Sequence, residues 1–548
     1  MTTLTEGCKR LTESEKRFED IYNIVFSYSG VFSRTYQDEK VTELTYRRAK
    51  EKIESLSGAL YKRVGSGSFV GLYGVNSEKW LLLFWAILKS GNKPYLINLH
   101  QPEAQIRSCL STLQVSQVIF TEEEKELGCG KVSYDELSFE NEPLPKEVSF
   151  ENELAITTSG TSLQEKICVF SGLEISAQIL NSLEAVGRNR RIIKSYKGEI
   201  RMLMLLPLYH IFGLVASYLW FLFTGAVFCF SGKKGSSALL ETAKTLRVTH
   251  IFSVPLLWHT LEKKITENLS KRSAFLRGYF RACFKLSLFF QNIFPRFGLL
   301  FPKIFLSPIR NATLGRGVRF CISGGSALKP SAMRQICALG FPLFSGYGST
   351  EIGIASVDFS KRPKNRAFPC AGVPFSSVEF EIRANGRLFV KGRSVCKKQM
   401  IDGVFTATES LFDTGDVAFK DEKGKYHIAG RDSDVVISDN GENLNPDLAE
   451  RAFALSGAVN FAVLGDEKNE RLILIVQTAK MPLGEEVTTL KKELIQGLER
   501  LPRSYRIKEI FITADPLIPK GEIKVSRTAL RNRIKDQKIS LFTFDING

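Results

Sequence analysis

The sequence predicts an α/β protein with a large N-terminal domain of layered, mostly parallel sheets with helices plus a β-rich subdomain, followed by a small mobile α+β C-terminal domain. The chain has 548 residues, more than the roughly 250–300 at which one hydrophobic core stops growing. Short apolar β-like runs alternate with amphipathic helical stretches up to about residue 330, an order typical of parallel sheets covered by helices. The pattern changes near Val378 and again after Arg431, so we expect domains at 1–431 and 432–548.

The alternation is clearest near the beginning of the chain. A β-like run at 68–74 precedes a helical stretch at 78–90, and a second β-like run follows at 93–99. Similar β-like runs occur at 250–254 and 318–323. We therefore expect strands in these runs and a helix between the first two.

The β-rich part begins with a predicted hairpin. Residues 378–382 alternate apolar and acidic side chains, Asn385 and Gly386 form a turn signal, and 388–390 return as an apolar run. This pattern is typical of two antiparallel strands.

Composition points to an anionic partner. Apolar residues make up 44% and charged residues 24%, which are ordinary globular values. The net charge is +17, from 75 basic and 58 acidic residues, which suits a nucleotide, CoA, an acidic carrier protein or lipid headgroups. A genomic bias toward Lys would give the same excess.

Cysteine usage and the N-terminus indicate a cytoplasmic protein. Ten cysteines occur without a C-x-x-C pair and with only five histidines, as expected of reduced structural thiols. Residues 1–7 lack a charged stretch followed by an apolar run, so we expect no secretory signal.

One segment is apolar enough to cross a membrane. Residues Ile211 to Phe230 carry no charge over twenty positions, which is long enough to span a bilayer. Gly225 divides them into a helical half, 211–223, and a β-like half, 226–230. A buried helix followed by a core strand is the favoured interpretation, and an integral membrane protein is the alternative.

The stretch 346–355 has the residue types that bind a nucleotide and its metal. It contains, in succession, Gly346, Tyr347, Gly348, Ser349, Thr350 and Glu351. Glycines let the main chain approach a ligand, and the Tyr347 ring offers a surface on which a base can stack. Glu351 suits Mg²⁺, which takes oxygen ligands together with substrate phosphates. A glycine-rich turn with a solvated Glu would have the same residues.

A second stretch suits a polyphosphate. Hydroxyl residues surround a glycine in the order Thr158, Ser159, Gly160, Thr161, Ser162, and the run closes on Lys166. Hydroxyls, backbone N–H groups and an ammonium are suited to phosphate oxygens. The Walker spacing of glycines is absent.

Two further stretches, 412–416 and 429–437, carry a carboxylate and a guanidinium near turns. Asp416 and Arg431 could both hydrogen-bond ribose hydroxyls. These four stretches, together with 207–214, 322–328, 440–446 and 523–527, resemble the adenylate-forming (AMP-binding) superfamily in this order over nearly the whole chain.

The resemblance implies ATP and Mg²⁺ as ligands and assigns roles to residues. The hydroxyl loop and Lys166 would hold the β- and γ-phosphates, Thr350 the α-phosphate and Glu351 the Mg²⁺. Asp416 and Arg431 would bind the ribose, and Lys524 would bridge the substrate carboxylate and phosphate. Tyr347 would stack on adenine, with Gly324, Gly325 and Ser326 along its edge, and Gly348 and Ser349 would also bind the nucleotide. In the family the small domain rotates about the position that Ser433 occupies.

Two positions of the phosphate loop depart from the family pattern, as does Ser433, where Lys or Asp is common. Leu163 and Glu165 stand where Gly and Pro are usual, so the phosphate loop loses a permissive glycine and gains an acid. A catalytically degenerate fatty-acyl or nucleotide-binding protein at the membrane surface is therefore an alternative to an enzyme.

The implied acid has an uncharged tail. Tyr209, His210, Phe212 and Gly346 match the acyl and thiol pocket of the family, and no aspartate lies in that segment to pair with an amino group. His210 could equally be a satisfied core histidine.

The stretch Lys271 to Arg319 gives further information about the class of acid. It contains ten basic residues, nine Phe and no acid, a mixture typical of an interfacial membrane segment. Buried helices with a solvated basic face are the alternative, and we expect no nucleic acid because no recognition motif accompanies the charge. A basic apolar insertion at this place also resembles long-chain fatty acyl-CoA and acyl-acyl carrier protein synthetases.

The sequence therefore predicts an enzyme that activates a medium- to long-chain fatty acid to acyl-AMP and transfers it to CoA or an acyl carrier protein. We expect it to be cytoplasmic, with peripheral association with anionic membranes.

Overall fold

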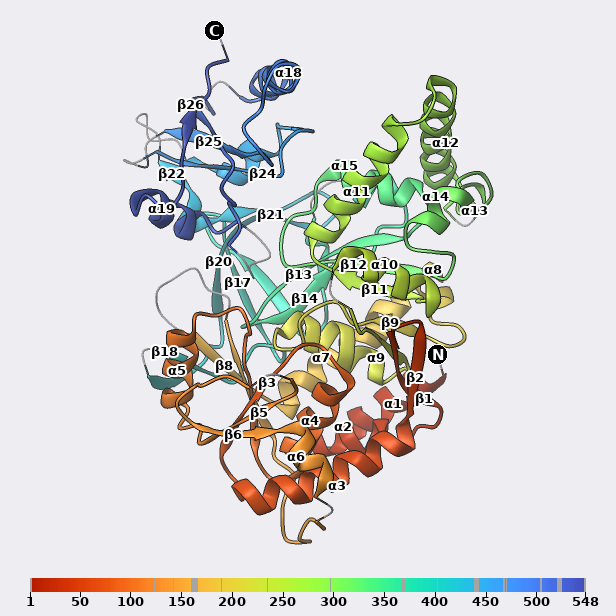
Figure 1. The fold of residues 1–548 in the computed structure, drawn as a ribbon, viewed down its shortest axis with the longest axis vertical. Helices are drawn as coiled ribbons and strands as arrows, with labels where there is room; N and C mark the ends of the chain where they lie inside the picture. Colours follow the sequence, from red (N-terminus) through yellow and green to blue (C-terminus); the bar gives the residue numbers. More distant parts are fainter. Residues whose placement is uncertain are drawn as a thin grey trace. The chain divides into compact units, whose positions relative to one another are not determined.

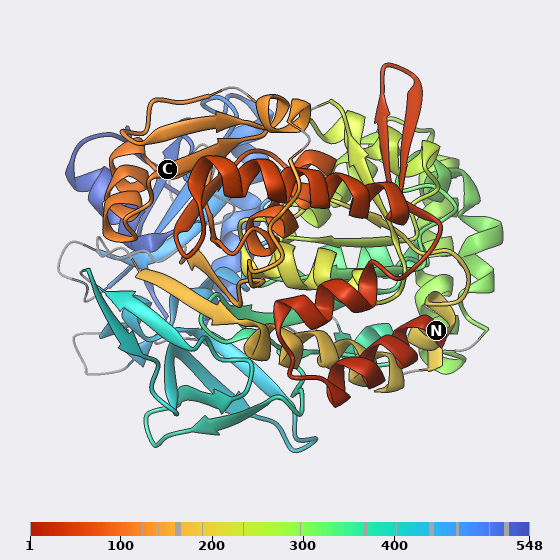
Figure 2. The same cartoon turned by 90° about the horizontal axis from the view of Figure 1, so that it is seen from below.

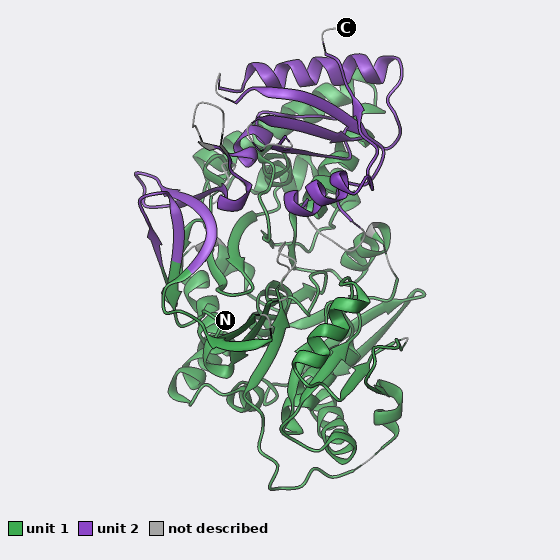
Figure 3. Cartoon of the chain, turned by 90° about the vertical axis from the view of Figure 1, so that its left-hand side faces the viewer, with its two compact units in different colours: residues 1–160, 164–379, 390–412 green, residues 161–163, 380–389, 413–548 purple. Residues whose placement is uncertain are grey.

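The computed structural model describes residues 2–122, 124–140, 142–158, 166–188, 190–233, 235–295, 297–366, 370–401, 403–437, 443–466, 469, 471–502, 505–519 and 525–546. These fall into two compact units (Figures 1 and 3). Unit 1 holds 1–160, 164–379 and 390–412; unit 2 holds 161–163, 380–389 and 413–548. The domain boundary that we expect at 431/432 marks the position near which the small domain would rotate. It stays a prediction.

Unit 1 contains two large sheets with parallel centres and antiparallel edges. In the nine-stranded sheet the parallel strands run from β13 through β12, β11, β9 and β10 to β1. In order across this sheet the strands are β15 (Val373–Pro374), β14 (Gly353–Val357), β13 (Leu343–Ser349), β12 (Phe320–Ser323), β11 (His250–Ser253), β9 (Arg201–Leu203), β10 (Val227–Ser231), β1 (Val31–Gln37) and β2 (Lys40–Thr45).

The second sheet has eight strands in the described part of the chain. Its parallel strands run from β7 through β4, β3 and β5 to β6. In order they are β19 (Val404–Ala407), β18 (Lys398–Ile401), β8 (Lys166–Ser171), β7 (Glu153–Thr157), β4 (Lys93–Leu96), β3 (Phe69–Tyr73), β5 (Gln117–Phe120) and β6 (Gly130–Ser133). The α/β class and the strands expected at 68–74, 93–99, 250–254 and 318–323 are confirmed.

Helices fill the space between these sheets and cover their outer faces (Figure 2). The central core joins side chains from both sheets to α4 and α7, and every residue from Trp80 to Leu88 of α4 is buried because its neighbours lie on all sides. The helices of unit 1 are α1 (Thr2–Glu13), α2 (Phe18–Val25), α3 (Tyr46–Val64), α4 (Glu78–Lys89), α5 (Glu103–Thr112), α6 (Tyr134–Phe139), α7 (Gly172–Arg188), α8 (Arg190–Ser195), η1 (Phe212–Leu219), α9 (Trp220–Leu222), α10 (Ser236–Thr245), α11 (Pro255–Ser270), α12 (Ala274–Ile293), α13 (Leu300–Phe305), α14 (Ser307–Ala312), α15 (Pro330–Ala338) and α16 (Pro363–Arg366).

The uncharged segment 211–230 is a buried helix followed by a core strand. Its helical half is η1 continued by α9, and its β-like half is β10. Gly225 makes the turn between them at a φ of +66°, which glycine adopts readily. The first part of this segment, η1, has π-type spacing, with the N–H of Trp220 donating to the carbonyl of Val215. Among the described residues, no helix combines the length and the apolarity needed to cross a bilayer.

The expected hairpin after Val378 is also present. β16 (Val378–Ile382) and β17 (Arg387–Gly392) are neighbours in a four-stranded sheet with β20 (Phe412–Lys420) and β21 (Tyr426–Arg431). Gly386, at a φ of +79°, closes its turn by donating its N–H to the Arg383 carbonyl at 2.8 Å.

The rest of unit 2 is α+β. Its four-stranded sheet has α17 and α18 on one face and α19 on the other. Its elements are η2 (Asp432–Asp434), β22 (Val436–Ile437), β23 (Asn443–Leu444), α17 (Pro446–Glu450), β24 (Asn460–Gly465), β25 (Leu472–Gln477), α18 (Glu485–Glu499), β26 (Ile507–Thr513), α19 (Arg527–Lys535) and β27 (Phe542–Thr543).

Candidate nucleotide and acyl site

The glycine-rich stretch 346–355 is a tight antiparallel hairpin. Ser349 of β13 pairs with Gly353 of β14, so that residues 350–352 form the turn. A Cβ on Gly348 would lie 2.1 Å from the Gly353 carbonyl oxygen, so only glycine allows the two strands to approach this closely. The hairpin thus presents Thr350 and Glu351 at its tip, both half-buried.

The backbone of this turn is fixed from outside. The N–H of Cys396 donates to the Glu351 carbonyl at 2.7 Å, and the Ser394 hydroxyl donates to the Ile352 carbonyl at 3.1 Å. Gln178, buried in α7, in turn donates to the Ser394 carbonyl at 3.4 Å. These contacts hold the main chain of the turn through its carbonyl groups rather than through the Glu351 side chain.

The hydroxyl-rich loop connects β7 to β8. The two strands are antiparallel, and the Thr158 N–H donates to the Lys166 carbonyl at 2.9 Å. Thr158 and Lys166 therefore lie opposite each other at the base of the loop. Ser159, Gly160, Thr161 and Ser162, and the departures Leu163 and Glu165, lie outside the described residues.

β18 links Lys166 to Glu351: it pairs with β8, which begins at Lys166, and Cys396 just before β18 donates its N–H to the Glu351 carbonyl at 2.7 Å. Burial raises the pKa of Cys168 well above its usual value, and contact with Cys396 raises it further. The negative charge of Glu351 adds to this rise in pKa, whereas the positive charge of Lys166 opposes it. The fold therefore brings the predicted phosphate-binding lysine and the predicted metal ligand into one neighbourhood.

The glycine pair after β12 adjoins the predicted acyl pocket. A Cβ on Gly324 would lie 2.7 Å from the Phe212 ring, so this glycine allows the ring to pack directly on the main chain. Gly325 has a φ of +86° and is exposed, as is Ser326. Residues expected along the adenine edge and in the acyl pocket are thus in contact.

Asn76 holds the segment that leads to the pocket. Its amide donates to the Leu206 carbonyl at 2.7 Å and accepts from the Leu208 N–H at 3.0 Å. The next residues, Tyr209 and His210, have ring centroids 4.8 Å apart. Their orientation is therefore fixed by the backbone just before them.

His210 is uncharged at neutral pH. Burial, together with repulsion from His100, lowers its pKa to about 4. The His100 ring centroid lies 6.4 Å from that of Tyr209, so both histidines line this region.

Gly346, the remaining residue expected at the acyl pocket, has space beside it. A Cβ added to Gly346 would lie 3.5 Å from the Ile322 side chain, which is an ordinary contact distance.

In unit 2, the predicted ribose ligands are directly paired. Asp416 of β20 lies opposite Arg431 of β21, and the Arg431 Nε lies 2.9 Å from the Asp416 Oδ1. Asp416 is buried and Arg431 is exposed. The pair therefore positions one carboxylate and one guanidinium side by side, with the guanidinium accessible to a ligand.

The predicted hinge residue lies in η2, between two ion-paired neighbours. Asp432 lies 3.4 Å from Arg387, which also pairs with Asp413. Asp434 lies 3.0 Å from Arg527. Ser433 itself is exposed, so the contacts of the hinge are made on either side of it.

Arg527 is the centre of a carboxylate cluster. Besides Asp434, it pairs with Asp447 and Glu450, each at 2.5 Å. Its Nε donates to the Val463 carbonyl at 2.7 Å. Lys524, three residues earlier, lies outside the described residues.

The role of several residues at these sites could not be predicted from the sequence. Asn76, His100 and Arg387 stand outside every motif. Gln178 is detectable only as a polar residue on the core-facing side of a helix. Arg527 belongs to the 523–527 motif, but its three carboxylate partners are far away in the sequence.

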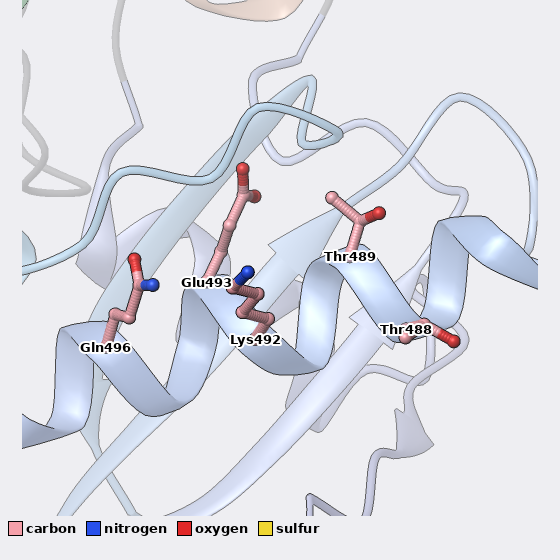
Figure 4. A pocket seen from close by; sticks show the side chains of 5 residues that line it. All are labelled: Thr488, Thr489, Lys492, Glu493 and Gln496. Atoms are coloured by element: carbon pink, nitrogen blue, oxygen red, sulfur yellow. The ribbon is translucent and has the colours of Figure 1, made fainter.

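A surface pocket on α18 is unrelated to these residues (Figure 4). It is lined by Thr488, Thr489, Lys492, Glu493 and Gln496, all from that helix. None of them belongs to the predicted nucleotide or acyl site.

The donor set suits Mg²⁺ bound mainly through phosphates. Within the described ranges, no three His, Cys, Asp or Glu side chains converge as a metal cluster. Mg²⁺ in nucleotide sites is commonly held by one or two carboxylates plus substrate phosphates. A single half-buried carboxylate at Glu351, near Lys166, fits that requirement.

Comparison with known proteins identifies the family. Residues 31–397 match the AMP-binding enzyme family, and the chain belongs to it. Long-chain-fatty-acid–CoA ligase 3 of Saccharomyces cerevisiae is 26% identical over 413 residues, which cover 70% of this chain and 57% of the yeast protein. The chain thus spans little more than half of that relative. A 2-succinylbenzoate–CoA ligase of Listeria monocytogenes is 23% identical over 505 residues, covering 90% of this chain and 94% of the relative.

Solved structures share the fold. The O-succinylbenzoate coenzyme A synthetase of Bacillus subtilis, in complex with ATP and magnesium ion, superposes with a TM-score of 0.71 at 19% identity. The match covers 94% of this chain and 99% of that structure. The chain therefore has the fold of a large N-terminal and a small C-terminal domain that these enzymes share.

Proposed function

We propose that this protein uses ATP to activate a medium- to long-chain fatty acid as acyl-AMP and then transfers the acyl group to a thiol. The acceptor is CoA or the phosphopantetheine arm of an acyl carrier protein. The observation that carries the proposal is that β18, in a chain of the AMP-binding enzyme family, pairs with β8 at Lys166, while Cys396 just before β18 holds the Glu351 carbonyl at 2.7 Å. CoA ligases among the relatives support CoA, and the net charge of +17 suits either acceptor.

The proposed chemistry has two balanced steps. In the first, a carboxylate oxygen of the acid attacks the α-phosphorus of ATP, and the bond to the bridging oxygen breaks to release pyrophosphate. In the second, the thiol sulfur attacks the carbonyl carbon of the mixed anhydride, AMP leaves, and the thiol proton passes to solvent. The protein's task is mainly positioning and electrostatic stabilisation.

We assign the phosphate and nucleotide contacts as follows. Lys166 and the loop 158–162 bind the β- and γ-phosphates, and Thr350 binds the α-phosphate. Glu351 holds Mg²⁺, which neutralises phosphate charge when bound. Adenine stacks on Tyr347 beside Gly324, Gly325, Ser326, Gly348 and Ser349, and the ribose binds Asp416 and Arg431.

The small domain completes the site for the first step and presents a different face for the second step. Lys524 bridges the acid and the phosphate, and rotation about Ser433 replaces the adenylation face by the thioester face. The ion pairs of Asp432 and Asp434 with different partners support a bend confined to the residue between them.

The electrostatics of the acyl pocket favour an uncharged tail. Succinylbenzoate carries a second carboxylate, which would need a cation where the tail binds. Tyr209 and Phe212 are uncharged, His210 is neutral because of its low pKa, and the segment 211–230 has no charge. A fatty acid therefore suits this pocket better than succinylbenzoate.

We also propose a cytoplasmic location with peripheral contact to anionic membranes. All ten cysteines are free thiols, as is typical of a reducing compartment.

A pyrophosphate-exchange assay tests the proposal. We expect ATP–pyrophosphate exchange to require a fatty acid. The rate of exchange should increase with chain length, since each buried methylene contributes about 0.8 kcal/mol to binding. Succinylbenzoate should support little exchange. Exchange with succinylbenzoate alone would identify a different acid, and no exchange with any acid would favour the degenerate alternative suggested by Leu163 and Glu165.

The acceptor is determined by a second assay. Acyl-AMP formed in the first step is offered to CoA or to a holo-acyl carrier protein, and thioester is measured. Acids of increasing length are compared with each acceptor.

A further inference from the structure

Helix α12 of unit 1 buries one stripe of its side chains. Cys283, Ser287 and Gln291, spaced four residues apart, are its buried residues. The Ser287 hydroxyl donates to the Ala338 carbonyl at 2.6 Å, and the Gln291 amide donates to the Cys337 carbonyl at 2.8 Å. These contacts hold α12 against α15, its neighbour in Figure 1.

A second stripe of apolar side chains runs along the same helix but faces outward. Its members are Phe275, Tyr279, Leu286, Phe289 and Ile293, with exposed fractions of 82%, 41%, 45%, 55% and 47%. Intervals of three, four and seven residues place them on one side of a helix. Such a stripe normally faces a hydrophobic core.

The exposed apolar surface continues beyond the helix. Further exposed members on the connection to α13 and on α13 itself are Phe294, Phe297, Leu300, Ile304 and Phe305. Ring contacts link the two sets, from Phe289 through Phe290 and Phe301 to Phe305. Exposed apolar side chains gathered in this way usually mark an interaction site. We call the two sets together the α12–α13 face.

A row of cations borders the α12 stripe. Arg277, Arg281 and Lys285 are exposed and follow each other at intervals of four, so they share a third side of the helix. Like charges at this spacing repel and destabilise a helix. No acidic residue occurs between 271 and 319, so the repulsion is not relieved within the segment. An anionic partner would relieve it.

We propose that the α12–α13 face docks on the surface of an anionic lipid bilayer. The helix lies in the plane of the interface, with its apolar stripe among the acyl chains and its cation row at the headgroup phosphates. On α12 the apolar and basic side chains form parallel stripes, just as the acyl chains and the headgroups of a bilayer surface form parallel layers. This inference rests on the proposed function, because it gives the enzyme access to acids that are dissolved in membranes.

The charge dependence is tested with a triple variant and a matched control. Arg277, Arg281 and Lys285 are replaced by Gln; in the control, the exposed Lys40, Arg47 and Lys50 of β2 and α3 are replaced by Gln. Binding is measured by co-sedimentation with vesicles of equal parts phosphatidylglycerol and phosphatidylcholine, and with phosphatidylcholine alone. Each basic residue near an anionic surface is worth about 1 kcal/mol, so the triple variant should bind on the order of 100-fold more weakly. The control should bind as the wild type does.

The apolar contribution is tested with Phe275→Ser/Phe289→Ser. These side chains are exposed, so the melting temperature should hardly change. Vesicle binding should weaken by on the order of 100-fold, because two aromatic rings no longer enter the acyl-chain region. Turnover of a vesicle-held long acid should fall in both variants, while exchange with a soluble short acid stays unchanged.

Three results would overturn the inference. Equal binding loss in the triple variant and its control would mean that no specific face is used. Loss of acyl carrier protein binding with unchanged vesicle binding would identify an acidic protein as the partner. A change in oligomeric state of the Phe variant without vesicle binding by the wild type would identify a second copy. In each case, intact fatty-acid-dependent exchange would leave the proposed function standing.

Discussion

Lys166 and Glu351 are the charged side chains on which the proposed phosphate chemistry depends most directly. One begins β8 after the hydroxyl-rich loop, and the other stands at the tip of the β13–β14 hairpin. β18 connects the two elements, because it pairs with β8 and because Cys396 just before it donates to the Glu351 carbonyl. At the residue scale, the site is therefore a pair of complementary charges, of which the lysine suits phosphates and the carboxylate suits Mg²⁺.

Replacing either side chain should impair the first step. Glu351→Gln and Lys166→Ala are each expected to lower pyrophosphate exchange by about 10²- to 10³-fold, the usual loss for one preorganised electrostatic group. The exposed Glu422→Gln and Lys423→Ala, in the turn between β20 and β21, serve as controls. Exchange that is unchanged in both site variants would refute the assignment.

A buried histidine gives a pH dependence of stability. His250 is fully buried, its ring centroid lies 5.2 Å from that of Tyr196, and burial lowers its pKa to about 3. The unfolded chain binds a proton near the usual histidine value of about 6.5, whereas the folded chain does not until pH falls to about 3. The stability associated with the neutral ring is therefore complete above pH ~6.5 and lost as pH falls toward about 3.

His250→Phe should remove this component. The free energy of unfolding, measured by chemical denaturation at several pH values, should fall less steeply with decreasing pH in the variant than in the wild type. Parallel curves for the two proteins would show that another group controls the pH dependence.

At the scale of elements, α19 joins the segment after the hinge to the rest of the small domain. Arg527 begins this helix and reaches Asp434 in η2 and two carboxylates at α17. Burial alone would lower the pKa of the guanidinium, but the three carboxylates raise it above its usual value. The charge cluster thus fixes η2, α17 and α19 relative to one another.

Removing the cation should destabilise these elements. Arg527→Met leaves three carboxylates without their common partner, and breaking a buried ion pair in this way typically costs about 3–5 kcal/mol. The denaturation midpoint should fall accordingly. Lys535→Met, an exposed position on the same helix, is the control and should change the midpoint little. Similar midpoints for the two variants would contradict a stabilising role of the cluster.

For the whole molecule, the proposed reaction divides into two steps that need different faces of the small domain. If Lys524 serves only the adenylation face, Lys524→Ala should abolish acyl-AMP formation. The same variant should still convert supplied acyl-AMP into thioester, because the second step does not need this lysine. Pyrophosphate exchange and thioester formation from synthetic acyl-AMP measure the two steps separately. Equal loss of both would argue against domain alternation.

The hinge should show the opposite behaviour. Ser433→Pro fixes φ near −65° and so restricts the backbone change on which rotation depends. Acyl-AMP should then accumulate, since the first step proceeds while the exchange of faces is slowed. A rapid-quench measurement of acyl-AMP against thioester detects this. Unchanged partitioning would mean that the bend lies elsewhere.

Local patterns in the sequence are sufficient to predict the class of fold and the candidate site residues. Alternating β-like and helical runs, the hairpin at 378–390 and the order of the motifs are local patterns, and each follows from the side-chain periodicity of a strand or helix or from turn chemistry. Local patterns also located Tyr347, Glu351, Asp416 and Arg431 as candidates, because hydroxyls, glycines and charges cluster within a few residues of one another.

Which of these residues are in contact depends on the tertiary structure. The pairing of Asp416 with Arg431 depends on strand register, and the contact of Phe212 with Gly324 depends on how η1 packs against the end of β12. In the same way, the nine Phe of 271–319 look alike in the sequence, whereas the packing of α12 and α13 determines which of them face solvent. Contacts between distant residues depend on how several elements pack at once, and no local pattern records that packing.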